Sequence, residues 1–153
     1  MISIRDNDGF AFCGGTIITP EYSVTAAHCK EFTNLRYYMI TTGHTQRSYR
    51  RSRGEVGFQE SKLSKFENHP KYDGVELVYD FAVLQMATPF QFTDYVMPAC
   101  LVQRNFEFTE QVQCLVSGWG NTARWDHMDS YDDNMQKAVV SYFSPTQCNK
   151  KNK

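Results

Sequence analysis

One histidine, His28, stands in a sequence context that could place it for chemistry. It ends the run VTAAH, in which a β-branched pair suits the end of a strand and two alanines suit a tight, closely packed turn. The ring would then be held on a rigid element and be free to face a cleft, while Cys29 could pin the turn to another part of the chain. Taken alone, the histidine favours a plainer interpretation, a core histidine beside a structural cysteine.

One aspartate, Asp80, also stands at a suggestive position. It precedes the apolar run FAVLQM at 81–86, which predicts a buried strand. A carboxylate at the head of such a strand must be hydrogen-bonded or paired, because an unpaired buried charge is costly. The sequence therefore predicts a partner for Asp80.

The elements that position these residues are expected to be strands. Ile2 and Ile4 alternate with polar residues, and the run DNDG at 6–9 predicts a hairpin turn into a second strand. Further strands are expected at 16–19, at 35–42 and, with weaker alternation, at 56–66. The segment 2–29 as a whole therefore predicts β structure.

The composition is that of a globular protein. The chain has 153 residues, of which 41% are hydrophobic and 14% aromatic, with a formal net charge of -1. A nearly neutral charge argues against a general role on nucleic acid or on membrane surfaces, and no stretch is long and apolar enough to cross a bilayer. The first six residues do not have the pattern of a signal peptide.

Five cysteines lie far apart in the sequence and show no C-x-x-C spacing. This disfavours zinc sites and dithiol redox motifs, so that no metal or cofactor is expected. The wide spacing fits disulfides and a secreted parent protein. Because the count is odd, at least one cysteine has no partner within these residues.

Three motifs carry a resemblance to a known family. They are CGGTII at 13–18 with TAAHC at 25–29, DFAVLQM at 80–86, and CLVSGWG at 114–120. Together they resemble the trypsin-like serine endopeptidases of the chymotrypsin family. The resemblance implies an all-β, chymotrypsin-like double β-barrel, with a nearly complete first barrel at about 1–101. Residues 102–153 would form the link between the barrels and the start of a truncated second barrel.

The resemblance also implies roles for the two candidate residues. His28 would be the general base and acid, and Asp80 the carboxylate that orients it, with a polypeptide as the substrate. The family's nucleophilic serine lies in GDSGG, which is absent here, as is the family's N-terminal activation end. The chain is therefore expected to be an inactive fragment of a peptidase. The alternative is a secreted, non-catalytic homologue that acts as a binding module.

The family pattern suggests pairings for the cysteines. Cys13 and Cys29 would form a bridge that closes a loop around the histidine. Cys114 and Cys148 would pair with cysteines beyond these residues, and Cys100 could bond to a second chain. A bridge outside the family pattern, among the last three cysteines, remains an alternative. A secreted location follows from the family and from this use of cysteine.

Two charged segments lie outside these motifs. Four arginines in seven residues, at 47–53, could bind acidic partners or heparin-like chains, although a solvated, mobile loop is the simpler interpretation. An acidic run at 124–133 contains Asp126, Asp129, Asp132 and Asp133 together with His127, which makes metal binding conceivable. The run lacks the spacing of a calcium loop, and a solvated surface loop is the favoured interpretation.

Overall fold

The computed structural model describes residues 1–109, 112–122, 131–144 and 146–148. The chain forms two compact units, Met1–Cys100 and Leu101–Lys153. Three candidate residues of the acidic run, Asp126, His127 and Asp129, lie outside the described residues. Asp132 is described, and its carboxylate accepts hydrogen bonds from the Asn134 N–H at 2.8 Å and from the Gln136 side chain at 2.9 Å. No helix of the described chain has the length and apolar character that a bilayer crossing requires.

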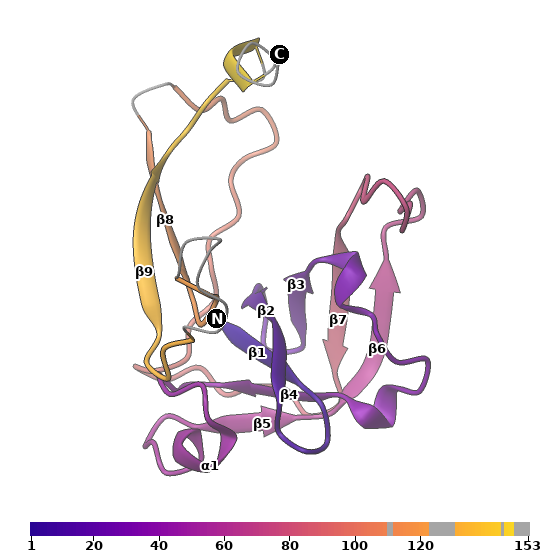
Figure 1. Cartoon of the computed structure of the whole chain (residues 1–153), viewed down its shortest axis with the longest axis vertical. Coiled ribbons are helices and arrows are strands. Elements are labelled where there is room, and N and C mark those ends of the chain that lie inside the picture. The colour runs from indigo at the N-terminus through magenta and orange to yellow at the C-terminus, as the bar shows by residue number, and fades with distance from the viewer. Residues whose placement is uncertain (110–111, 123–130, 145, 149–153) are drawn as a thin grey trace. The chain divides into compact units, whose positions relative to one another are not determined.

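The first unit is built on one antiparallel sheet of seven strands, in the order β5-β4-β1-β2-β3-β7-β6. The strands are β1 Ile2–Arg5, β2 Ala11–Ile17, β3 Tyr22–Thr25, β4 Met39–Thr42, β5 Gln59–Ser61, β6 Leu63–Asn68 and β7 Ala82–Met86. β5 and β6 occupy the two opposite edges of the sheet although only Lys62 separates them in the chain. The sheet therefore curls back on itself as a half-barrel (Figure 1).

The hairpin predicted at the start of the chain is confirmed. The turn between β1 and β2 is closed by a hydrogen bond from the Gly9 N–H to the Asp6 carbonyl, at 3.1 Å. The Asp6 side chain accepts a second bond from the Phe10 N–H, at 2.8 Å. Gly9 has a φ of 86°, a conformation that glycine adopts without steric cost. β1 pairs with β2 on one side and with β4 on the other, so all four of its residues are buried.

The core of the half-barrel is aliphatic in its centre and aromatic at one side. Among its fully buried members are Ile2, Ile4, Ile17, Ile40 and Leu84. Aromatic rings pack against this cluster, including an edge-to-face pair of Phe32 and Tyr38 at 5.3 Å. In β7 the side chains of Ala82, Leu84 and Met86 are buried while those between them are half-buried, so the predicted buried strand is confirmed.

Three element boundaries differ from the predictions. The strand expected at 35–42 is divided into a 3-10 turn, η2 Leu35–Tyr37, and β4, because the Asn34 side chain caps the turn at the Arg36 N–H. The strand expected from 56 to 66 begins only at β5, since Gly57 packs against the Gly43 carbonyl before the strand starts. The arginine-rich segment is not irregular throughout but contains one helical turn, α1 Tyr49–Ser52.

The described residues of the second unit include an antiparallel pair of strands. β8 Gln113–Gly118 pairs with β9 Gln136–Ser141, with Cys114 opposite Val140. All six residues of β9 are exposed. The mostly β architecture of both units confirms the predicted all-β fold class.

Candidate active site

His28 lies on a short 3-10 turn, η1 Ala27–Cys29, directly after β3. The turn is closed by backbone hydrogen bonds from Cys29 to Ala26 and from Lys30 to Ala27. The small side chain of Ala27 and that of Cys29 face the core, at 1% and 3% exposure. The His28 side chain between them is 52% exposed. The alternation of small, polar and apolar residues in this turn therefore directs the imidazole outward.

A disulfide fixes this turn to the sheet. Cys13 of β2 bonds to Cys29 of η1, with 6.1 Å between the two Cα atoms and a separation of 16 positions in the sequence. Gly15 lets β2 approach β3 closely, because a Cβ atom there would lie 2.5 Å from the Val24 carbonyl oxygen. The predicted bridge is confirmed, and it holds His28 against the body of the half-barrel.

The same cysteines do not form a metal site with the histidine. The candidate donor atoms of Cys13, His28 and Cys29 all lie within 4.8 Å of one another. The two sulfur atoms are bonded to each other, however, and a cysteine ligates a metal as a free thiolate. This cluster therefore serves to anchor the histidine.

The register of β3 and β7 brings Asp80 to His28. The strands are antiparallel, and Thr25, the last residue of β3, lies opposite Ala82, the first residue of β7. The chain that leaves β3 therefore meets the chain that enters β7. Nδ1 of His28 lies 2.6 Å from Oδ2 of Asp80, and the His28 backbone N–H donates to Oδ1 at 2.8 Å. These two contacts orient the carboxylate and the ring together.

The electrostatics of the pair favour an ionised aspartate. The hydrogen bond from the His28 ring, followed by the bond from its backbone N–H, lowers the pKa of Asp80. The Asp80 side chain is 22% exposed. With Nδ1–H donated to the carboxylate, Nε2 carries the lone pair that can accept a proton. Nε2 makes no hydrogen bond to any residue that the structure describes.

The loop that precedes Asp80 holds an unusual backbone that the sequence did not reveal. Leu77 and Tyr79 both adopt positive φ angles, 54° and 55°, which are uncommon for residues other than glycine. The Tyr79 ring stacks on the His69 ring, with centroids 4.9 Å apart and planes 7° apart. The His69 N–H also donates to the Phe81 carbonyl at 2.7 Å. These contacts hold the chain on both sides of Asp80.

The remaining three cysteines lie outside the Cys13–Cys29 bridge. Cys100 is an exposed free thiol at the boundary of the first unit, and Cys114 is a half-buried free thiol on β8. Cys148 lies in the second unit and is exposed. The predicted pairings of these three cysteines with other segments or chains stay predictions.

Comparison with known proteins identifies the family. The Trypsin family model matches residues 1–153, the whole chain. The chain therefore belongs to the trypsin family of serine proteases, and its curled half-barrel and small second sheet confirm the predicted chymotrypsin-like fold class.

A curated relative agrees with this assignment. "Transmembrane protease serine 9" of Rattus norvegicus is 36% identical over 121 residues, which are 78% of this chain and 11% of that protein. The chain thus spans about a tenth of the length of the relative it matches. Family membership together with the Cys13–Cys29 disulfide indicates a protein that faces the extracellular side.

Proposed function

We propose that this chain carries the histidine and aspartate of the catalytic centre of a secreted serine endopeptidase, which hydrolyses peptide bonds. The observation that carries the proposal is the 2.6 Å contact between Nδ1 of His28 and Oδ2 of Asp80. The roles are those of the general catalytic template of the trypsin family. His28 acts as general base and then as general acid, and Asp80 fixes its tautomer and stabilises the imidazolium.

In this mechanism the proton moves through Nε2 of His28. A serine hydroxyl attacks the scissile carbonyl and passes its proton to Nε2, which then delivers that proton to the leaving amine. In the second half of the reaction, water attacks the acyl-enzyme and gives a proton to Nε2. Nε2 then returns that proton to the serine oxygen as the acid product leaves. Asp80 remains ionised throughout, in keeping with its lowered pKa. The serine must come from outside these residues, because the sequence contains no Gly-Asp-Ser.

The proposal makes a two-part prediction. The purified 153-residue polypeptide should show no inhibitor-sensitive hydrolysis of a peptide ester, because removal of the nucleophile costs about as much as removal of the whole triad. If the transcript continues in frame into a GDSGG segment, the extended product should hydrolyse the ester after activation. In that product, Asp80→Asn should lower kcat by about 10⁴-fold, the magnitude known for the family's own triad.

Two further variants serve as controls for this experiment, one at an exposed position and one at His28. Lys65→Gln, at an exposed position in the same unit, should leave turnover unchanged. Turnover by the 153-residue polypeptide itself would contradict the assignment of an external serine. An extended product that keeps its activity as His28→Ala would refute the role of the histidine.

The second candidate function is that of a non-catalytic binding module. The observation that favours it is the folded arginine-rich turn α1, with exposed Arg50, Arg51 and Arg53. A confirmed stop codon after Lys153, with stable secreted protein, would support this alternative over the peptidase. In either case Cys100 is an exposed free thiol that could join a second chain. Electrophoresis with and without reductant tests that link.

A further inference from the structure

The segment 47–54, here called the arginine loop, concentrates positive charge. It carries four arginines and no acidic residue, in a chain whose formal net charge is -1. Arg50, Arg51 and Arg53 are exposed, whereas Ser52 is fully buried and anchors the α1 turn. A dense local charge of one sign attracts partners of the opposite sign.

Glu55 ties the base of the arginine loop. Its carboxylate accepts hydrogen bonds from the Gln46 N–H at 2.8 Å, from the Thr45 N–H at 2.9 Å and from the Thr45 hydroxyl at 3.0 Å. Burial, the largest single influence, raises the pKa of Glu55, but these hydrogen bonds together outweigh it and the net pKa is lowered. A loop closed in this way has less conformational freedom to lose when a partner binds.

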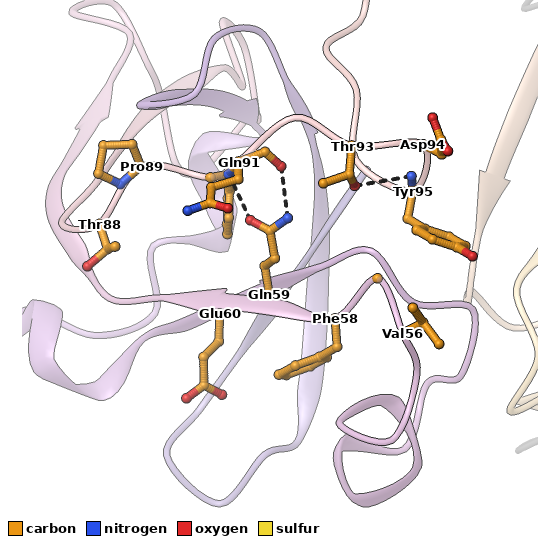
Figure 2. A pocket seen from close by; sticks show the side chains of 12 residues that line it. Val56, Phe58, Gln59, Glu60, Thr88, Pro89, Gln91, Thr93, Asp94 and Tyr95 are labelled. Carbon is orange, nitrogen blue, oxygen red and sulfur yellow. Dashed lines mark hydrogen bonds between the residues drawn. The ribbon is translucent and has the colours of Figure 1, made fainter.

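Tyr49 connects the arginine loop to a hollow between segments 56–60 and 88–95. The Arg53 guanidinium carbon lies 5.6 Å from the centroid of the Tyr49 ring. The Tyr49 hydroxyl donates to Glu60 at 2.8 Å, and its ring packs against Phe58 at 6.2 Å. Phe58 and Glu60 both line the hollow (Figure 2). Tyr49 therefore links Arg53 of the arginine loop to two residues that line the hollow.

The hollow, here called the β5 groove, lies between segments 56–60 and 88–95 and has a volume of about 590 Å³. The Gln59 side-chain amide bridges the two walls, since it donates to the Gln91 carbonyl and accepts from the Gln91 N–H, both at 2.8 Å (Figure 2). Two apolar side chains of the groove are largely exposed, Val56 at 90% and Tyr95 at 63%.

The acidic residues of the groove determine where an anionic group of a partner can bind. Glu60 and Asp94 line it, so an anion is disfavoured inside the groove itself and favoured over the arginine loop. A partner that fits both parts carries carboxylates at one end and an apolar side chain at the other. A sulfated polysaccharide offers the anions but no apolar group, and its sulfates would face the two carboxylates.

We propose that the arginine loop and the β5 groove form a docking surface for an extended acidic polypeptide segment. Its carboxylates lie over Arg50 and Arg53, and an adjoining apolar side chain enters the groove beside Val56 and Tyr95. This surface does not involve His28 or Asp80. The proposal therefore stands or falls independently of the proposed peptidase function.

The test is binding of a fluorescein-labelled synthetic peptide, with a short run of glutamates next to a phenylalanine, to the full 153-residue chain. Fluorescence anisotropy should show saturable binding that weakens as salt rises from about 0.05 M to about 0.5 M, because salt screens exposed charges. The double variant Arg50→Glu/Arg53→Glu should bind about tenfold or more weakly. Val56→Ser should weaken binding several-fold for this peptide but not for one with serine in place of phenylalanine.

A matched control separates the docking surface from net charge. Lys65→Glu/Lys71→Glu makes the same change in charge at two exposed lysines of the same unit, and it should alter affinity by less than about twofold. Circular dichroism checks that each variant is folded, and Arg50→Gln/Arg53→Gln replaces the charge reversal if that variant unfolds.

Three results would overturn the proposal. One is the absence of saturable peptide binding. Another is an equal loss of affinity in the lysine control. The third is a heparin-derived oligosaccharide that binds as tightly as the peptide while the phenylalanine is dispensable, which would identify a charge-only site for polysaccharide.

Discussion

Acid should destabilise the first unit through His44, a histidine away from the candidate active site. His44 is only 5% exposed. Its Nδ1 lies 2.9 Å from the Gln46 carbonyl oxygen and its Nε2 lies 2.9 Å from the Thr41 hydroxyl. The Thr41 hydroxyl oxygen also accepts the Arg5 Nε–H at 3.0 Å. This arrangement suits a neutral ring that donates through Nδ1 and accepts through Nε2.

The size and sign of the effect follow from the environment of His44. Burial, and then the charge of Arg5, lowers the pKa of His44 from 6.5 to about 4, although the Gln46 carbonyl and the Glu55 charge act in the opposite sense. Between these values the unfolded chain binds a proton that the folded chain excludes. Stability is therefore complete above the unfolded pKa of 6.5 and is lost as the pH falls toward 4. At 1.36 kcal/mol per pKa unit, the loss amounts to about 3 kcal/mol.

The measurement is the free energy of unfolding in urea, followed by circular dichroism between about pH 7 and about pH 4. The variant His44→Gln keeps hydrogen-bonding groups but cannot titrate, so its stability should fall less over this range. Asp80 and Glu55 also lose stabilising interactions in acid, because the pKa of each is lowered. Both groups are present in the two proteins, and Glu55 interacts with His44, so the difference between the two curves reports His44 together with its coupling to Glu55. Parallel curves for the two proteins would refute the reasoning.

Two further predictions concern covalent and backbone constraints. Replacing Cys13 and Cys29 with serine should lower the free energy of unfolding by about 3 kcal/mol, as expected for a bridge of this loop length, and an unchanged urea midpoint would contradict it. Gly43→Ala should cost more than about 2 kcal/mol, because Gly43 has a φ of 71° and a Cβ atom there would lie 1.7 Å from the Gly57 carbonyl oxygen. Gly54→Ala, which meets only the Arg51 carbonyl oxygen at 3.4 Å, is the control and should have a much smaller effect on the same urea curve.

Several features of the site could be predicted because their causes are local in sequence. The small residues before His28 predicted a tight turn, and η1 forms there. The apolar run after Asp80 predicted a buried strand, and β7 forms there. The bridge between Cys13 and Cys29, which the family pattern suggested, also forms. Each of these predictions depended on residues that are neighbours or belong to one motif.

Other boundaries could not be predicted because they depend on contacts between distant segments. The strand expected from 56 onward begins late because Gly57 meets the Gly43 backbone and Tyr95, neither of which is near it in sequence. The arginine-rich segment was expected to be a mobile loop, yet it contains α1 and is tied by Glu55 to Thr45 and Gln46. The positions of residues along the chain do not reveal which distant segments will come into contact.

The sequence by itself determined that this is an all-β member of the trypsin family with a histidine on a tight turn and an aspartate at the head of a strand. The family resemblance implied that Asp80 orients His28, but only the tertiary structure gives the cause of the contact. The two residues are 52 positions apart, and the register of β3 against β7 brings them together. The tertiary structure also decided which charges are buried and which are presented outward. His44 is enclosed, whereas Arg50 and Arg53 face solvent, because burial depends on how the sheet curls rather than on the residues next to each position.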